Sequence, residues 1–418
     1  MSSLRSELLQ LMAATPTVDC HAHTRSESEY YDQGPYDLFT LGSYFDREIG
    51  ALSGQFPGRY YDREAPDEER WQHLKAIVDR CFNESYWRHN LVTYRDLFGF
   101  EGAELDDSNW QALNDSIRHR TADRSWYRDV TVNRANVRTQ VKNIPWFEDW
   151  DPAYFTPILR MEPALEIYRP GPRRQLEERV NRGIHSLRDL REALTALVEE
   201  FAGRGAVGIK LAHAYRRTLE SRPVAEVTAA MLLDRALRGE ALPWAEARQL
   251  EDYVIFFLAG LCTDRDLIFD IHTGVQGNGC WIPDSNPLLL LNLIQAFPRT
   301  RFNLYHGGYP WSREIGMMAK HCSNVWLNMA WMYVIGMEVS RQSLSEWLDL
   351  APGYRILGFG SDVGFPEFVY GHLVMARSCV ADVLATKVER DFLSEAGARR
   401  LAVMLMHDNA AEFYRLEA

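Results

Sequence analysis

Short apolar segments with the composition of buried β-strands recur along the chain and alternate with longer stretches in helical rhythm. Eight can be identified: TVDCHAH (17–23), NVRTQV (136–141), FTPILRM (155–161), AVGIKLA (206–212), LIFDIHT (267–273), RFNLYHG (301–307), NVWLNMA (324–330) and RILGFGS (355–361). Several are nearly continuous apolar runs, which indicates strands buried on both faces of a parallel sheet. The alternation predicts an α/β fold, a (β/α)8 TIM-like barrel.

One connection is much longer than the others. More than a hundred residues separate the first predicted strand from the second, and YWRHNLVTYRDLFGF (86–100) within them has helical periodicity. We therefore expect a single domain over residues 1–418 with a mostly helical insertion at 26–130. A second long connection, about 215–265, contains LEDYVIFFLAGL (250–261), which predicts a buried helix. Loops that follow barrel strands lie on the catalytic face, so both segments are expected to cap the site.

Composition disfavours several classes of protein. The formal charge is −12 and the pI about 5.5, which argues against nucleic-acid binding. No stretch approaches the roughly 18 uncharged apolar residues of a membrane helix, and the N-terminus lacks the apolar core of a signal peptide. We expect a cytoplasmic protein that acts on a small molecule and has neither a nucleic-acid nor a membrane partner. Assembly into a homo-oligomer is possible. A cysteine-based zinc site or disulfide scaffold is disfavoured by the scattered positions of the six cysteines: Cys20, Cys81, Cys262, Cys280, Cys322 and Cys379.

The segment DCHAH (19–23) carries the strongest local signal for chemistry. Residues i and i+2 of a strand point the same way, so the imidazoles of His21 and His23 can share one metal ion. By itself an H-x-H pair is as compatible with two ordinary histidines as with a metal site. Polar residues at other predicted strand ends change that balance, because TIM-like barrels carry their chemistry there. These are Lys210, His272, His306 and Asp362.

Charge and ligand chemistry suggest a role for each group. His21, His23, His272 and Asp362 can form one nitrogen and oxygen site with an open position for water, whose pKa the ion would lower. Asp362 can accept the proton of that water and pass it to the leaving group. His306 can polarise a substrate carbonyl or stabilise an oxyanion.

Lys210 allows three interpretations from sequence. It can be carbamylated and bridge two metals, bind a substrate carboxylate, or form a salt bridge with a neighbouring acid, so one or two ions are expected. Further candidates for substrate binding lie in loops after the strands, where arginine forks suit a carboxylate-bearing substrate. These candidates are Arg25, Tyr215, Arg216, Trp311 and Arg313.

Together, the H-x-H pair, His272, His306 and Asp362 resemble the ligand set of the amidohydrolase superfamily. The branch related to nodulins and FluG proteins is similar in IHTG (271–274), GIKLAHAYR (208–216), YHGGYPWSRE (305–314), NVWLNMAWM (324–332) and GSDVGFPE (360–367). WRHNLVTYRDLFGF (87–100), in the aromatic insertion, resembles uronate isomerases more distantly. The resemblance implies a distorted (β/α)8 barrel that binds a divalent metal, with zinc expected and manganese or iron as alternatives.

Three functions are compatible with these features. The first is a metal-dependent hydrolase that cleaves a C–N or C–O bond of a small, carboxylate-bearing substrate with a metal-activated water. The second is a non-hydrolytic metal enzyme of the same superfamily, either an aromatic acid decarboxylase or a uronate-type isomerase. With His272 the chain has a full superfamily-like ligand set, and in this it departs from the uronate isomerase pattern. The departure favours hydrolysis over isomerisation. The third is a non-catalytic barrel used for protein interaction.

Overall fold

The computed structural model describes residues 3–42, 45–46, 50–51, 54, 59–277 and 281–416. It contains one eight-stranded sheet whose strands neighbour one another in chain order, from β1 to β8. From β3 onward, each strand pairs in parallel with its successor. This order, with helices in the connections, is the topology of a (β/α)8 barrel and confirms the predicted fold class.

All eight strands lie where the apolar runs predict them. Seven end earlier than expected and one, β2, continues three residues further. Every position of β1, β4 and β5 is buried, as expected for parallel strands covered on both faces. The strands are β1 Thr17–Ala22, β2 Val137–Ile144, β3 Phe155–Arg160, β4 Gly208–Leu211, β5 Ile268–Ile271, β6 Arg301–Leu304, β7 Val325–Asn328 and β8 Ile356–Leu357.

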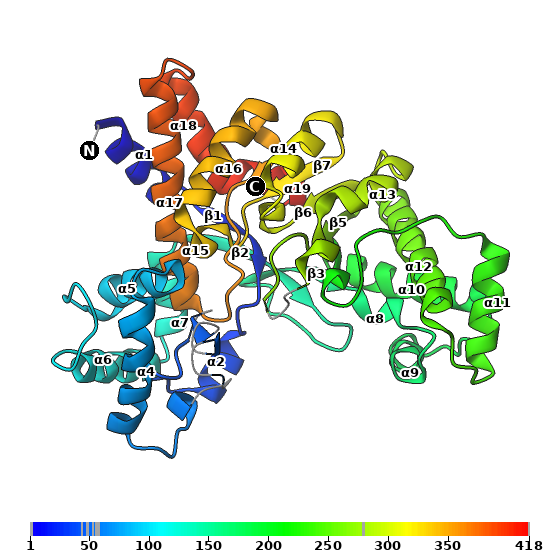
Figure 1. The fold of residues 1–418 in the computed structure, drawn as a ribbon, viewed down its shortest axis with the longest axis horizontal. Helices are drawn as coiled ribbons and strands as arrows, with labels where there is room; N and C mark the ends of the chain where they lie inside the picture. The colour runs from blue at the N-terminus through cyan, green and yellow to red at the C-terminus, as the bar shows by residue number, and fades with distance from the viewer. Residues whose placement is uncertain are drawn as a thin grey trace. The chain divides into compact units, whose positions relative to one another are not determined.

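Helices lie in every connection except the one between β2 and β3, and the insertion after β1 is mostly helical, as predicted. The segment 250–261 lies inside α12, a helix with many buried positions. The helices are α1 Ser3–Ala14, α2 Glu27–Gln33, α4 Asp67–Cys81, α5 Ser85–Phe98, α6 Trp110–Ala122, α7 Trp126–Arg128, α8 Glu162–Leu165, α9 Pro170–Val180, α10 Leu187–Gly203, α11 Glu226–Leu237, α12 Trp244–Arg265, α13 Leu291–Ala296, α14 Ser312–His321, α15 Met332–Ile335, α16 Met337–Leu350, α17 Pro366–Glu389, α18 Glu395–Val403 and α19 Asn409–Tyr414 (Figure 1).

The chain forms two compact units, each assembled from several segments. The first comprises residues 1–140, 330–344 and 358–408, and the second comprises 141–329, 345–357 and 409–418. The boundaries of a single domain and the capping role of residues 26–130 stay predictions. Five cysteines are free thiols, and Cys280 lies outside the described residues.

Within the first unit, α17 is a core helix that packs against α1 and α5 (orange and blue in Figure 1). A Cβ at Gly371 would overlap Thr93 Oγ1, so glycine permits the close approach of α17 and α5. By length and composition alone α17 could cross a membrane, but 78% of its most apolar window is buried inside the fold. A core helix passes the same test, so this feature does not indicate a membrane protein.

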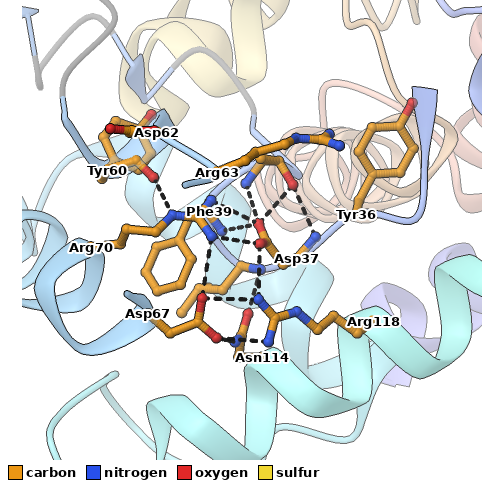
Figure 2. A network of polar contacts seen from close by, with 12 residues as sticks. Tyr36, Asp37, Phe39, Tyr60, Asp62, Arg63, Asp67, Arg70, Asn114 and Arg118 are labelled. Carbon is orange, nitrogen blue, oxygen red and sulfur yellow. Dashed lines mark hydrogen bonds and ion pairs between the residues drawn. The ribbon is translucent and has the colours of Figure 1, made fainter. Parts of the chain in front are cut away.

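Four charged side chains connect the insertion internally (Figure 2). Asp37 lies in the loop after α2, Asp67 and Arg70 lie on α4, and Arg118 lies on α6. Arg70 is 2% exposed, and its Nη1 contacts Asp37 Oδ2 at 2.8 Å and Asp67 Oδ1 at 3.3 Å. Arg118 binds the same two carboxylates through Asp67 Oδ2 at 2.7 Å and Asp37 Oδ2 at 3.2 Å. We call these residues the charged quartet.

Candidate metal centre

Three of the residues predicted as metal ligands converge in the first unit. The Nε2 atoms of His21 and His23 each lie 3.3 Å from Asp362 Oδ1, and the potential ligand atoms of the three residues all lie within 4.8 Å of one another. His21 belongs to β1 and His23 directly follows it, which gives the shared direction expected at i and i+2. The side chains of His21 and Asp362 are buried, whereas that of His23 is 40% exposed, so the group opens to solvent beside His23.

The donor set fits a divalent metal ion. Two imidazole nitrogens and one carboxylate oxygen are ligands that zinc, iron and manganese accept. Tetrahedral ligands about 2.1 Å from a shared ion lie roughly 3.4 Å apart, close to the 3.3 Å between Asp362 Oδ1 and each histidine Nε2. Three protein ligands leave a coordination position for water or substrate, as catalytic sites require.

Backbone geometry at Asp362 supports this convergence. The residue has φ of +53°, a left-handed conformation that costs a non-glycine residue about 1–2 kcal/mol. Its backbone N–H donates to the carbonyl of His21 at 2.8 Å, which connects the chain after β8 directly to β1. A strained conformation of this kind persists only where surrounding contacts determine it.

Two buried groups that were not singled out as functional residues from sequence lie beside this segment. Asp19 Oδ1 accepts the backbone N–H groups of His21 at 3.2 Å and Ser361 at 2.8 Å. His372 Nδ1 lies 2.9 Å from the carbonyl oxygen of Ser361. Burial raises the pKa of Asp19 to about 7 and lowers that of His372 to about 3. Asp19 was detectable because it is two residues before His21, whereas His372 lies on α17 with no sequence signal.

The second unit brings His272 and His306 together. His306 Nε2 and His272 Nδ1 are 2.9 Å apart, and His272 Nε2 is 2.8 Å from the carbonyl oxygen of Val275. A carbonyl only accepts, so His272 Nε2 carries a hydrogen and donates it to Val275. Ligation of a metal by His272 would require one of these hydrogen bonds to break. The ligand role of His272 and the electrophilic role of His306 stay predictions.

Lys210 lies among buried polar groups in the second unit. It is opposite Asp270 in the β4–β5 register, and its Nζ is 3.2 Å from the centroid of the Tyr305 ring. Asp270 in turn accepts the Tyr305 hydroxyl and, at 2.9 Å, the side-chain amide of Asn303. Burial raises the pKa of Asp270, and the positive charge of Lys210 opposes that rise. The choice among the three interpretations of Lys210 stays a prediction.

Among the predicted substrate-binding residues, Arg25 has the most constrained setting. Its guanidinium stacks 4.1 Å above the ring of Phe365, while Nη1 donates to Gly364 O at 3.0 Å and Nε to Gln33 Oε1 at 2.9 Å. These contacts fix a planar cation two residues after His23.

The other four candidates have more ordinary surroundings. Arg216 pairs with Glu166, and Arg313 pairs with Glu346 while remaining 79% exposed. The Tyr215 ring lies 4.7 Å from that of His272, and its hydroxyl accepts the Gly277 N–H at 2.9 Å. Trp311 is half-buried immediately before α14.

Comparison with known sequences identifies two similarities. A family profile described as amidohydrolase matches residues 174–416, a stretch that includes Asp362, His272 and His306 but not the H-x-H pair. Protein fluG of Emericella nidulans is 26% identical over 235 residues, which are 53% of this chain and 27% of that protein. The match therefore spans about a quarter of the length of that relative.

Comparison with solved structures extends the similarity to the whole chain. A uronate isomerase from Thermotoga maritima has a TM-score of 0.85 at 15% identity, and the alignment covers 99% of this chain and 98% of that isomerase. A glucuronate isomerase from Caulobacter crescentus has a TM-score of 0.82 at 18% identity and covers 100% of this chain and 94% of its own. At these identities the likeness is one of fold.

Proposed function

Because the chain belongs to the amidohydrolase family, which the profile matches over more than half of its length, we propose that it is a metal-dependent hydrolase. In this proposal it cleaves a C–N or C–O bond of a small, carboxylate-bearing substrate. The convergence of His21 Nε2, His23 Nε2 and Asp362 Oδ1 carries the proposal. A divalent ion held by these atoms, zinc by expectation and manganese or iron as alternatives, would supply Lewis acidity toward water or a substrate carbonyl.

Asp362 is the proposed general base and acid. Its carboxylate is positioned beside the opening at His23, where water and substrate can enter. The carboxylate takes one proton from the attacking water while the water oxygen bonds to the substrate carbonyl carbon. It then returns that proton to the departing nitrogen or oxygen as the C–N or C–O bond breaks. The reaction consumes one water molecule and needs no redox partner.

Arg25 is the proposed anchor for the substrate carboxylate. Contacts with Phe365, Gly364 and Gln33 hold its guanidinium in one plane, so little rotamer entropy is lost when an anion binds. Pairing with Glu166 and Glu346 makes Arg216 and Arg313 weaker candidates. For His306, the proposed role is to polarise the scissile carbonyl.

The test combines metal analysis with a substrate screen. Protein purified without added metal is analysed for bound transition metals, and the metal-loaded protein is screened against N-acyl amino acids, lactones and γ-glutamyl amides. We expect hydrolysis that transfers 18O from labelled water to the product. His21→Ala, His23→Ala and Asp362→Asn should each lower metal content or turnover more than about 100-fold, beyond the effect typical of outer-shell partners.

A control variant separates ligand loss from general damage. His321→Ala removes an exposed histidine at the end of α14 and should retain full metal content. Product that forms without 18O from water would count against hydrolysis. The absence of any bound metal, together with no affinity for added Zn²⁺ or Mn²⁺, would count against a metal enzyme of either kind.

Uronate-type isomerisation is the second candidate, favoured by the fold likeness to uronate isomerases over nearly the whole chain, insertion included. Incubation of the metal-loaded protein with D-glucuronate tests it, with NMR detection of the ketose product. Isomerisation moves hydrogen within the substrate and cleaves no C–N or C–O bond, so formation of the ketose without a cleavage product would select this candidate. The dependence on His21 and His23 would be the same in both cases, and only the product distinguishes them.

A further inference from the structure

The short segment that carries Asp362 is held on three sides by buried groups of the first unit. Ser361 and Asp362 follow β8, and each of their peptide groups has a defined hydrogen-bond partner. The Ser361 N–H donates to Asp19 Oδ1 at 2.8 Å, and the Asp362 N–H donates to the His21 carbonyl at 2.8 Å. The Ser361 carbonyl completes the set by accepting from His372 Nδ1 at 2.9 Å.

Asp19 couples two of the proposed ligands through the backbone. One oxygen, Oδ1, accepts the N–H of His21 at 3.2 Å as well as the N–H of Ser361. The same carboxylate therefore fixes the peptide before the first histidine ligand and the peptide that leads to Asp362. Asp19 is fully buried, so water does not compete for these hydrogen bonds.

His372 acts on the other side of the same peptide. Because its partner is a carbonyl, Nδ1 must carry the hydrogen. The ring is fully buried between aromatic neighbours, with Phe359 at 5.4 Å and Tyr333 at 5.6 Å between ring centroids. This packing fixes the ring plane, so the donor stays directed at the Ser361 carbonyl.

We propose that Asp19 and His372 are positioning residues that together grip the Ser361 peptide and thereby hold Asp362 in its left-handed conformation. In that conformation Asp362 Oδ1 faces both histidine Nε2 atoms at 3.3 Å. Neither residue is a ligand in this scheme, and each acts on the metal only through backbone groups. The inference rests on the proposed metal site and adds the groups that determine its geometry.

Binding of Co²⁺ alone tests the proposal, since its visible d–d spectrum reports ligand geometry independently of any activity. Asp19→Ala and His372→Phe remove the two side-chain hydrogen bonds to the Ser361 peptide groups, and the phenylalanine keeps an aromatic ring in the packed position. We expect each variant to bind Co²⁺ about 10–100-fold more weakly than the wild-type chain and with an altered d–d spectrum. His372→Asn places an amide N–H near the Nδ1 position and Asp19→Asn retains an acceptor oxygen, so both should restore affinity to within about threefold.

Leu384→Ala is the matched control for general destabilisation. Leu384 is fully buried on α17, the helix that carries His372, but has no part in the grip. This variant should lower the thermal midpoint while keeping wild-type Co²⁺ affinity and spectrum. If Asp19→Ala does not fold, the aromatic replacement His372→Phe decides the matter.

The outcomes distinguish this inference from the proposed function. Folded Asp19→Ala and His372→Phe proteins that bind Co²⁺ with the wild-type affinity and spectrum would overturn the positioning roles and leave the metal site standing. If Leu384→Ala loses affinity to the same degree, the effect is general destabilisation and the positioning roles are again wrong. Failure of the wild-type chain itself to bind Co²⁺ would overturn the proposed function, and this inference with it.

Discussion

At the scale of single residues, Lys210 shows how neighbours select among chemical forms of one side chain. The lysine is 1% exposed, lies opposite Asp270 across β4 and β5, and contacts the face of the Tyr305 ring. An ammonium group is attracted both by a carboxylate and by the negative face of an aromatic ring. A carbamylated lysine would be an anion and would be repelled by both. We therefore expect Lys210 to be a cation with a structural role.

Replacement of Lys210 tests this assignment. We expect Lys210→Met to lower the free energy of unfolding by about 3 kcal/mol, because it leaves the buried carboxyl of Asp270 without its cation. Metal stoichiometry, measured by elemental analysis after loading with Zn²⁺, should equal that of the wild-type chain. His23→Ala serves as the comparison that does lose metal. Loss of one of two bound ions in Lys210→Met would instead indicate a carbamylated bridge.

Residue chemistry and strand position made much of the candidate site predictable from sequence. His21 and His23 follow from a two-residue spacing on one strand, and that geometry needs no information from the rest of the chain. Ser361, by contrast, is hydrogen-bonded to Asp19, 342 positions away in the sequence, and to His372, 11 positions away. A helical histidine gives no sign of the carbonyl that it faces, so the grip on the Ser361 peptide becomes apparent only in three dimensions.

At the scale of elements, the charged quartet determines how the loop after α2 joins α4 and α6 (Figure 2). Asp37 Oδ1 also accepts the backbone N–H of Thr40 at 2.8 Å and its hydroxyl at 2.7 Å, so one carboxylate orders the loop and receives both arginines. Hydrogen bonds and the Arg70 guanidinium lower the pKa of Asp37 despite its burial. A carboxylate held in this way stabilises the fold above its ordinary pKa, and that stabilisation is lost on acidification.

Arg70→Lys tests the quartet while preserving its charge. The Arg70 fork reaches the Tyr60 carbonyl at 2.9 Å in addition to Asp37 and Asp67, and a single ammonium group cannot make all of these bonds. We expect the free energy of unfolding to fall by about 2 kcal/mol, with faster amide exchange in α4 by mass spectrometry. Arg313→Lys is the control: the Arg313 side chain is 79% exposed and makes a similar forked contact with Glu346. This change should lower the free energy of unfolding by less than about 1 kcal/mol. Equal losses in the two variants would show that burial of the quartet contributes nothing.

Strand ends were the least predictable feature of the elements. The predicted eighth strand ran to Ser361, whereas β8 contains only Ile356 and Leu357. Residues 358–360, between the end of β8 and Ser361, are apolar and buried, so their sequence cannot be distinguished from that of a strand. Their hydrogen bonds instead go to several other elements: the Cys20 N–H of β1 donates to the Phe359 carbonyl, the Trp331 N–H donates to the Gly360 carbonyl, and the Gly358 N–H donates to the Leu405 carbonyl. The same apolar composition thus serves a strand and the buried loop that carries Asp362.

At the scale of the whole molecule, the barrel topology follows from alternating apolar runs. Which ionisable side chains are buried, and how burial shifts their pKa values, does not follow from sequence. Three histidines far apart in the chain, His89, His213 and His372, are buried, and burial lowers their pKa values to between about 3 and 4. Burial raises the pKa of Glu367. As the pH falls, the histidines destabilise the fold and the glutamic acid stabilises it, so the pH dependence of stability is a difference between opposing contributions.

His89→Gln isolates one of these contributions. Burial lowers the pKa of His89 to about 4, so between about pH 6.5 and 4 only the unfolded chain binds the proton. Its contribution to stability is complete above pH 6.5 and is lost at about 1.4 kcal/mol per pH unit below it. Glutamine can keep the 2.8 Å hydrogen bond from His89 Nε2 to the Phe368 carbonyl but takes up no proton.

Relative to the wild-type chain, His89→Gln should therefore be about 2 kcal/mol more stable at pH 5 than at pH 7.5, as measured by urea unfolding at both pH values. His73→Gln, which removes a histidine whose side chain is 46% exposed, is the comparison variant measured in the same way. If the curves for His89→Gln and wild type ran parallel, His89 would have the same pKa in the folded and unfolded chains, and its burial would have no electrostatic consequence.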